Sequence, residues 1–137
     1  MKNKLATTGA LLIAVGVGLC GQANAAPEPT LGVAHPSKLP DATGLGTVRP
    51  TTISIASTGS STVRQIVWES WGGPQAKGHG ITSNGASEPN VPIDLVALDL
   101  GVCGGDPAPQ STGPVYRQLD RIAPGRTYET GVVDDLC

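Results

Sequence analysis

The sequence predicts an all-β fold, a small sandwich or open barrel of about six short antiparallel strands with one disulfide. Three observations lead to this prediction. Residues 49–137 consist of short β-favouring runs separated by glycine, proline and other turn residues. No stretch has a convincing helical periodicity. Beyond residue 25 the chain holds two cysteines, Cys103 and Cys137, which allow a single pairing.

The first two predicted strands follow each other closely. The run TTISIAS, residues 51–57, alternates Ile53 and Ile55 with polar neighbours, as a strand with one buried face does. After the turn residues TGSS, the run TVRQIVWESW, residues 62–71, is predicted as the strongest strand. Two glycines and Pro74 end this strand, because neither residue type suits the interior of a central strand.

The second half predicts a turn, two longer strands and a short last one. Residues 75–87 are small and polar, and they contain Asn84 followed by glycine, the dipeptide most typical of a two-residue hairpin turn. Residues 91–102 are apolar enough for a strand covered on both faces. Residues 115–122, VYRQLDRI, are predicted as a strand, with a helix as the alternative. Residues 127–133 lead into the cysteine tail.

The start of the chain resembles a secretory signal peptide. Lysines precede an apolar stretch, residues 10–19, and the small residues 23–25 mark a cleavage site. The stretch has about half the length of a membrane-spanning helix, so we expect no transmembrane anchor. Lipidation of Cys20 is an alternative, but the bulky Leu19 before it argues against this. We expect cleavage after Ala25 and a secreted or cell-envelope location.

Cleavage would also change the charge and leave an even pair of cysteines. The mature chain keeps seven basic and eleven acidic residues, a formal charge of −4, because only Lys2 and Lys4 are lost. Without a basic cluster, this balance gives no electrostatic basis for binding nucleic acid. In an oxidising compartment Cys103 and Cys137 would pair, and closing a loop of about 35 residues would stabilise the fold by roughly 3–4 kcal/mol.

Residues 26–48 are rich in proline and glycine and show no periodicity, so we expect an extended, poorly ordered lead-in. His35 within it has no second ligand at metal-binding spacing, which favours a solvated histidine. The predicted organisation is a signal peptide over residues 1–25, the lead-in over 26–48 and one β domain over 49–137.

Two of the four aromatic residues, Trp68 and Trp71, lie three residues apart in WESWGG. Residues three apart on a strand point to opposite faces. We expect Trp68 to fill the core, because its face is the more apolar one. Trp71 is then covered by a loop such as residues 77–81, or it stands exposed as a stacking platform for a sugar ring or a partner protein.

The run TVRPTTISIASTGSSTVRQIVWESWGGPQAKGHG resembles a segment of small exported proteins of mycobacteria, streptomycetes and other actinobacteria. The similarity continues through VPIDLVALDLGVC and VYRQL, and thus covers most of the domain but not the lead-in. Streptomycete-like members carry further cysteines after the glycine motif, so their disulfide pattern does not transfer. The resemblance implies export and a β-rich fold and assigns no biochemical activity. Its motif, W-x-S-W-G-x3-A-x-G-x-G, falls on Trp68, Ser70, Trp71, Gly72, Ala76, Gly78 and Gly80.

The sequence lacks a strong catalytic motif. The best candidate set is His79 with a carboxylate from Glu69, Asp94 or Asp99 and an unspecified serine, and nothing beyond residue type supports it. Asp94 and Asp99 lie an odd number of residues apart, so on one strand they would face opposite ways, unlike a glycosidase pair. We therefore expect no catalytic residue, no metal site and no cofactor.

The function we expect is that of a secreted, non-catalytic β module. It would bind cell-envelope glycan or another exported protein around Trp71, with Glu69 and His79 as neighbouring candidates. A passive structural protein with no dedicated site is the alternative, and a small secreted hydrolase using His79 ranks third. Exposure of Trp71 separates the first two interpretations, whereas a cluster of His79, a carboxylate and a serine would favour the third.

Overall fold

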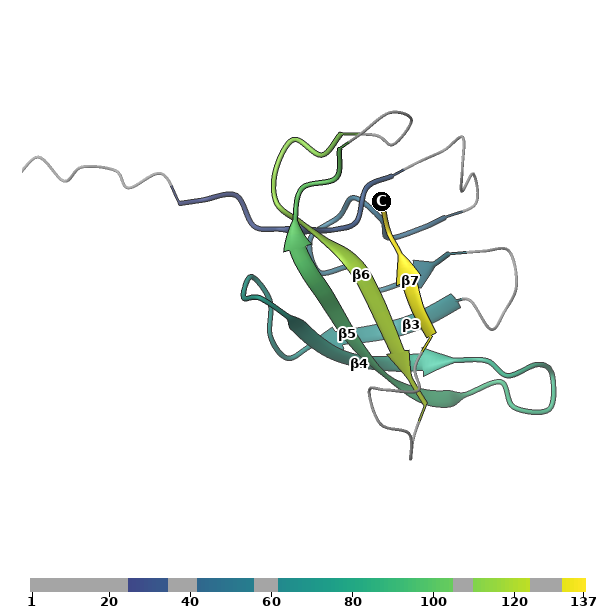
Figure 1. Ribbon diagram of the computed structural model, residues 1–137. Coiled ribbons are helices and arrows are strands. Elements are labelled where there is room, and N and C mark those ends of the chain that lie inside the picture. Colours follow the sequence, from purple (N-terminus) through teal and green to yellow (C-terminus); the bar gives the residue numbers. More distant parts are fainter. Residues whose placement is uncertain (1–24, 35–41, 56–61, 105–109, 124–131) are drawn as a thin grey trace, which may run out of the picture.

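A computed structural model describes residues 25–34, 42–55, 62–104, 110–123 and 132–137. Over these residues the chain is all-β, with no helix in the described ranges. Six strands form one curled half-barrel sheet in the order β1-β6-β5-β4-β3-β2, and β7 pairs with β6 (Figure 1). The strands are β1 Thr30–Leu31, β2 Ile53–Ser54, β3 Thr62–Trp68, β4 Ala76–Thr82, β5 Val91–Gly101, β6 Val115–Ile122 and β7 Val132–Asp135.

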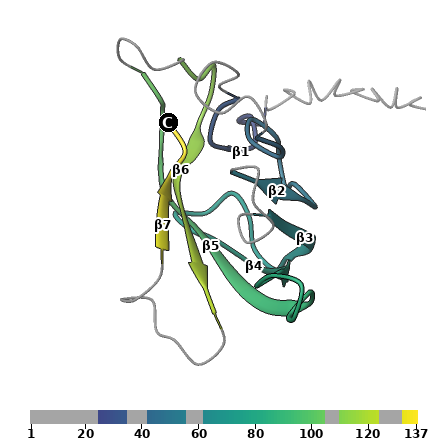
Figure 2. The ribbon, with the colours of Figure 1, turned by 90° about the vertical axis from the view of Figure 1, so that its right-hand side faces the viewer.

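The centre of the sheet is an antiparallel meander of β3 to β6. β4 pairs with β5 from Ala76 opposite Ala97 to Thr82 opposite Val91. On its other side, β5 pairs with β6 in a long antiparallel ladder. β6 in turn pairs antiparallel with β7. The two-residue β1 is the exception, because it runs parallel to β6. Figure 2 shows the resulting curl, with β5, β6 and β7 on one side and β1, β2 and β3 on the other.

The core fills the inside of this curl. Its members come from nearly every strand and from the two segments that flank the sheet. Their alternation with exposed neighbours follows the two-residue period of a strand, most clearly in β4. The buried cluster consists of Leu31, Leu45, Ile53, Val63, Ile66, Ala76, Leu95, Ala97, Tyr116, Leu119 and Leu136.

Residues that precede the predicted domain complete the half-barrel. Leu31 of β1 bridges Thr47, and Thr43 bridges Ser54 of β2. These isolated bridges lead from β1 back to β2, across the open side of the sheet. Leu31 is fully buried and Leu45 is 6% exposed. The prediction of a poorly ordered lead-in is therefore wrong for residues 26–34 and 42–48, because two leucines within the proline-rich and glycine-rich stretch enter the core.

The hairpin between β4 and β5 also differs from its prediction. Thr82 pairs with Val91, so residues 83–90 form the connection in place of a two-residue turn. Gly85 has a φ of 84°, as expected for a turn glycine. The side-chain amide of Asn84 donates to Glu88 at 2.8 Å and stabilises this longer loop. The dipeptide marked a turn correctly, but not the length of the turn.

Two predictions in the C-terminal half are confirmed. Residues 115–122 form strand β6 and not a helix. Cys103 and Cys137 form a disulfide with a Cα–Cα distance of 5.6 Å. Leu136, which directly precedes Cys137, is buried. Its backbone N–H donates to the backbone carbonyl of Arg117 on β6 at 2.8 Å. The chain end is therefore attached to the sheet by a covalent bond and by packing.

Several predictions concern residues outside the described ranges, among them the signal peptide up to residue 24, His35, and residues 127–131. No helix within the described ranges is long and apolar enough to cross a membrane.

Candidate functional site

The two tryptophans are positioned by an irregularity in β3 and by the end of that strand. Gln65 has a φ of 55°, and the pairing with β4 shifts register between Arg64 and Val67. Beyond this bulge Ile66 is buried, whereas Val67 is 55% exposed. β3 ends at Trp68. Trp71 consequently lies in the following turn and not on the strand, so the alternation that predicted opposite faces does not apply to it.

The indole of Trp71 lies on the core side, in contact with two aromatic rings. Its centroid is 4.6 Å from that of Trp68 at an interplanar angle of 71°, and 5.2 Å from that of Tyr116 at 75°. Both arrangements are edge-to-face, the favourable geometry for aromatic pairs. The prediction that Trp71 points away from Trp68 is therefore wrong. Trp71 is half-buried and packs against the hydrophobic core.

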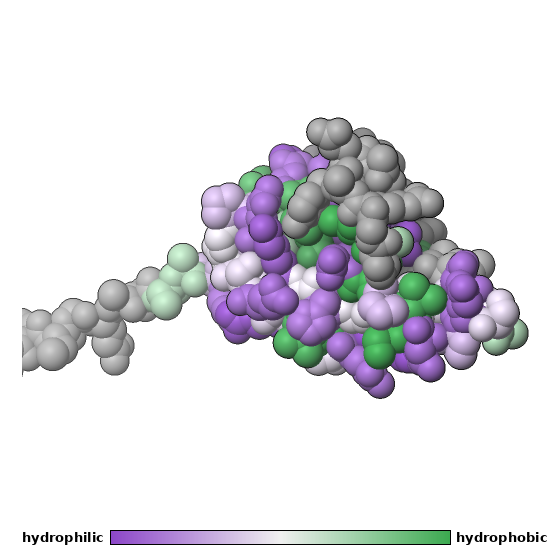
Figure 3. Space-filling view, turned by 90° about the horizontal axis from the view of Figure 1, so that it is seen from below, coloured by the Kyte–Doolittle hydropathy of each residue, from purple (hydrophilic) through white to green (hydrophobic). Residues whose placement is uncertain are grey.

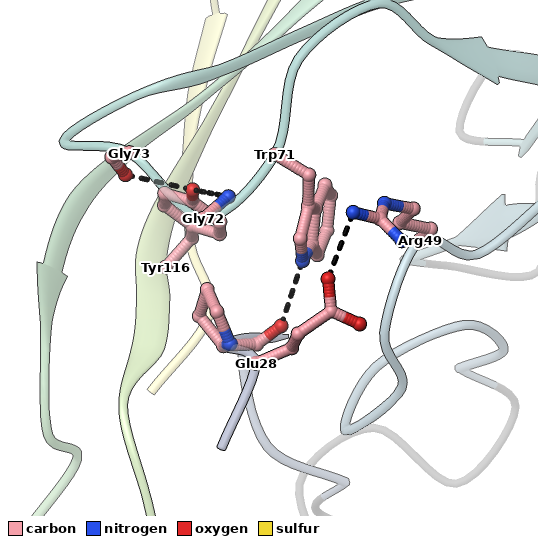
Figure 4. A network of polar contacts seen from close by, with 7 residues as sticks. Glu28, Arg49, Trp71, Gly72, Gly73 and Tyr116 are labelled. Carbon is pink, nitrogen blue, oxygen red and sulfur yellow. Dashed lines mark hydrogen bonds and ion pairs between the residues drawn. The ribbon is translucent and has the colours of Figure 1, made fainter. Parts of the chain in front are cut away.

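Each indole N–H donates to the carbonyl oxygen of a buried proline. Trp71 Nε1 donates to Pro29 at 2.9 Å, as Figure 4 shows, and Trp68 Nε1 donates to Pro50 at 2.9 Å. Pro29 belongs to the segment before β1, and Pro50 precedes β2. The lead-in thus contributes to the cover over Trp71. Residues 77–81, offered as one possible covering loop, are part of strand β4. Through these two hydrogen bonds, the tryptophans attach the segments around Pro29 and Pro50 to the end of β3.

Tyr116 on β6 forms hydrogen bonds with the loop that follows Trp71. Its hydroxyl donates to the carbonyl of Gly73 at 2.8 Å and accepts from the N–H of Gly72 at 2.9 Å (Figure 4). Burial raises the pKa of the Tyr116 phenol, and the Gly72 hydrogen bond opposes this rise. The hydroxyl therefore keeps its proton and can serve as donor and acceptor at once. Beside the cluster, Arg49 and Glu28 form an exposed ion pair at 2.8 Å.

Two glycines of β4, Gly78 and Gly80, leave room for side chains of β3 to pack closely against β4. A Cβ atom on Gly78 would lie 2.9 Å from the Trp68 ring and 2.8 Å from the Val67 carbonyl oxygen. A Cβ atom on Gly80 would lie 2.7 Å from Val63. Both distances are far below ordinary contact, so the close approach of the Trp68 ring and the Val63 side chain requires glycine at these positions. Of the motif glycines on β4, Gly78 therefore packs against Trp68 of the same motif, whereas Gly80 packs against Val63 outside it.

Glu69 and His79 lie on the outer surface of the same strands. His79 Nδ1 and Glu69 Oε1 are 3.0 Å apart, and their side chains are 53% and 64% exposed. His79 is paired with Val67 on β3 and with Asp94 on β5, so these side chains share one face. A surface depression of ≈ 260 Å³ lies beside the pair. It is lined by Glu69, Lys77, Gly78, Asp94, Leu95 and Val96.

The predicted binding residues are thus divided between two sides of the sheet. Glu69 and His79 meet on the outer surface, whereas Trp71 packs on the core side. Sequence reasoning missed Pro29, Pro50 and Tyr116, the partners of the two tryptophans. No local signal in the sequence marks the two prolines as acceptors, because each lies at least 18 residues from its tryptophan.

A serine, histidine and carboxylate triad is only partly represented. Glu69 contacts His79, but the hydroxyl of the neighbouring Ser70 accepts a hydrogen bond from the Lys77 N–H at 3.0 Å. Asp99 pairs with Arg117 at 2.6 Å, away from His79. Within the described part of the chain, no group of three or more His, Cys, Asp or Glu side chains could hold a metal ion.

A larger hollow of ≈ 420 Å³ lies between residues 27–34 and residues 110–115. Among the residues that line it, Glu28 alone is ionisable, and Glu28 is paired with Arg49. Its other polar side chains, Thr30, Gln110, Ser111 and Thr112, are uncharged, whereas the depression on the outer surface of β3 to β5 is lined by the ionisable Glu69, Lys77 and Asp94. The outer surface of β3 to β5 is therefore the better candidate.

No protein-family model, curated protein or solved structure matches the chain. The resemblance to exported actinobacterial proteins therefore stays a prediction.

Proposed function

We propose that this chain is an exported, non-catalytic β module that binds another exported protein through the outer surface of β3 to β5. We define this outer surface by the five residues Val67, Glu69, Lys77, His79 and Asp94. The observation that carries the proposal is the 55% exposure of Val67, which lies directly across from His79 and beside the Glu69–His79 pair. Exposed apolar surface next to ionisable side chains is typical of protein interfaces, which combine apolar contacts with polar ones.

The distribution of apolar residues supports the choice of this surface. On the face seen from below in Figure 3, the coloured apolar residues form small groups between hydrophilic ones. Large hydrophobic side chains that are exposed in the described ranges therefore have to be weighed singly. They are Val48, Val67, Leu100, Val102 and Val133. Of those that lie on a strand, Val67 is the most exposed, and it pairs across the sheet with His79 of the Glu69–His79 pair.

A protein partner is favoured over a glycan because the outer surface lacks an aromatic platform. Sugar rings stack on exposed indoles or phenols. The Trp71 indole instead contacts Trp68 and Tyr116, and its N–H is bonded to Pro29. Export itself is supported by the predicted signal peptide and by the disulfide, which is typical of oxidising compartments. Glu69 beside His79 also suits a hydrolase, but Ser70 is bonded to Lys77.

Site-specific photo-crosslinking in the producing cells tests the proposal. A photoreactive phenylalanine analogue replaces Val67 in one variant and Val48, which is 39% exposed, in the matched control. We expect a discrete adduct from position 67 but not from position 48, and we expect its loss when His79→Ala and Glu69→Ala are added. Mass spectrometry of the crosslinked peptides identifies a protein partner, and loss of the added mass on treatment with glycan hydrolases identifies a glycan. No adduct at position 67, or equal adducts at both positions, would favour a passive structural protein.

A further inference from the structure

Asp120, in the middle of β6, is a buried carboxyl group without a full set of partners. Its side chain is 2% exposed, and its Oδ1 atom has no hydrogen-bond partner. In the sheet Asp120 pairs with Val96 of β5 on one side and with Val133 of β7 on the other. A buried, incompletely bonded carboxylate is costly, whereas the neutral acid costs much less. This position therefore favours the protonated form of Asp120 more than an exposed position would.

The ionisable groups around Asp120 reinforce this preference. Asp134 of β7 adds a second negative charge nearby, and burial together with this charge raises the pKa of Asp120. Arg121, the adjacent cation, is bound to Asp134 at 2.8 Å, although its backbone N–H does donate to Asp120. On the same face, Asp94 of β5 and Asp135 of β7 lie diagonally across from Asp120, and Lys77 of β4 lies beyond Val96.

β7 is the neighbour of Asp120 that can most easily move. It has four residues, and within the described ranges it pairs with β6 alone. Val133, directly opposite Asp120, is already 50% exposed. The disulfide at Cys137 holds the chain two residues after β7 ends. Water can reach an ionised Asp120 if β7 separates from β6, and the disulfide then keeps the strand close to the sheet.

We infer that Asp120 acts as a pH-dependent latch for β7. While Asp120 is protonated, β7 stays paired with β6; when Asp120 ionises, the pairing loosens and the last strand becomes available at the edge of the sheet. Because the carboxyl pKa is raised in the folded chain, the latch is closed on the acidic side and opens as the pH rises through that pKa.

An NMR titration of the mature, disulfide-bonded protein tests this inference. The carboxyl carbon resonance of Asp120 is followed over the pH range together with the hydrogen-exchange protection of the residue 132–135 amides, corrected for the intrinsic pH dependence of exchange. We expect Asp120 to titrate above the ordinary aspartate pKa, and we expect the protection of the β7 amides to fall along the Asp120 curve. Titration of Asp120 at the ordinary aspartate pKa, or protection of β7 that does not follow Asp120, would overturn the inference.

Two variants sharpen the same experiment. Asp120→Asn keeps the shape and removes the ionisation, so the exchange protection of its β7 amides should stay at the acidic level throughout. Asp94→Asn removes a carboxyl group from the same sheet face and should leave the β7 titration as in the wild type. If β7 still moves with pH in a folded Asp120→Asn variant, another group controls the strand. These readouts do not depend on partner binding, so the outer-surface proposal can fail separately.

Discussion

At the scale of single residues, the paired tryptophans have partners that the sequence does not reveal. The rule of alternation correctly placed Trp68 toward the core, because Trp68 is still part of β3. It failed for Trp71, which follows the end of the strand and returns to the same side. A prediction from periodicity holds only as far as the strand extends. β3 ends at Trp68, several residues before the glycine pair that was expected to end it.

The packing of β4 against Trp68 gives a prediction at this scale. Gly78→Ala should destabilise the protein by about 1–3 kcal/mol, because the added methyl group would collide with the indole ring and a backbone carbonyl. Urea unfolding followed by circular dichroism measures the change. Gly104→Ala is the matched control, since no heavy atom lies within 4 Å of a Cβ built at this glycine. Equal stability of the two variants would show that packing of the Trp68 ring does not require glycine at position 78.

At the scale of secondary-structure elements, three of the four long central strands were predicted from the sequence, but β4 was not. Residues 76–82 form β4, although they lie in the small, polar stretch 75–87 that the sequence indicated as a turn region. Residues 62–68, 91–101 and 115–122 carry enough β-favouring residues to indicate their type. β1 has two residues, and its parallel pairing with β6 depends on contacts with residues more than eighty positions away. Local composition therefore suggested disorder for residues 26–48, although Leu31 is fully buried.

The contribution of β1 to stability can be tested by truncating the buried side chain of Leu31. Leu31→Ala should lower the free energy of unfolding by about 2–5 kcal/mol, the range found for buried leucines. Val48→Ala in the same lead-in should have little effect, because Val48 is 39% exposed. Thermal and urea unfolding of both variants provide the comparison. A Leu31→Ala variant as stable as Val48→Ala would mean that residues 26–34 are dispensable for the fold.

At the scale of the whole molecule, a small half-barrel is held closed at its two chain ends. The N-terminal side is fastened by Trp71 and Pro29, and the C-terminal side by the disulfide and Leu136. The sequence indicated the disulfide because the two cysteines beyond residue 25 allow one pairing. It could not indicate the fastening by Trp71, which is a hydrogen bond between residues 42 positions apart.

Reduction of the disulfide should destabilise the whole molecule. The bond joins residues 34 positions apart. On the chain-entropy model, its loss should lower the free energy of unfolding by roughly 3–4 kcal/mol. Calorimetry with and without a thiol reductant measures this effect, and the Cys103→Ser, Cys137→Ser double variant serves as the reductant-insensitive control. If the reductant left the melting temperature of the wild type unchanged, the bridge would contribute nothing to global stability.

The raised pKa of Asp120 predicts how stability changes with pH. Because the folded chain holds this proton more tightly than the unfolded chain, the stabilisation is complete below the ordinary aspartate pKa. It is lost as the pH rises through the folded value. Asp120→Asn should therefore increase stability at neutral pH and change it less at acidic pH. Unfolding free energies measured across the pH range check the sign, and a variant less stable than the wild type at neutral pH would contradict it.

The most direct measurement is the unfolding free energy of Trp71→Phe compared with that of Glu69→Gln. Phenylalanine keeps an aromatic ring but removes the indole N–H that donates to Pro29. If Trp71 fastens the lead-in to the sheet, Trp71→Phe should lose about 1–2 kcal/mol, while the exposed Glu69→Gln stays within roughly 0.5 kcal/mol of the wild type. Wild-type stability in Trp71→Phe would contradict a structural role and return Trp71 to consideration as a binding platform.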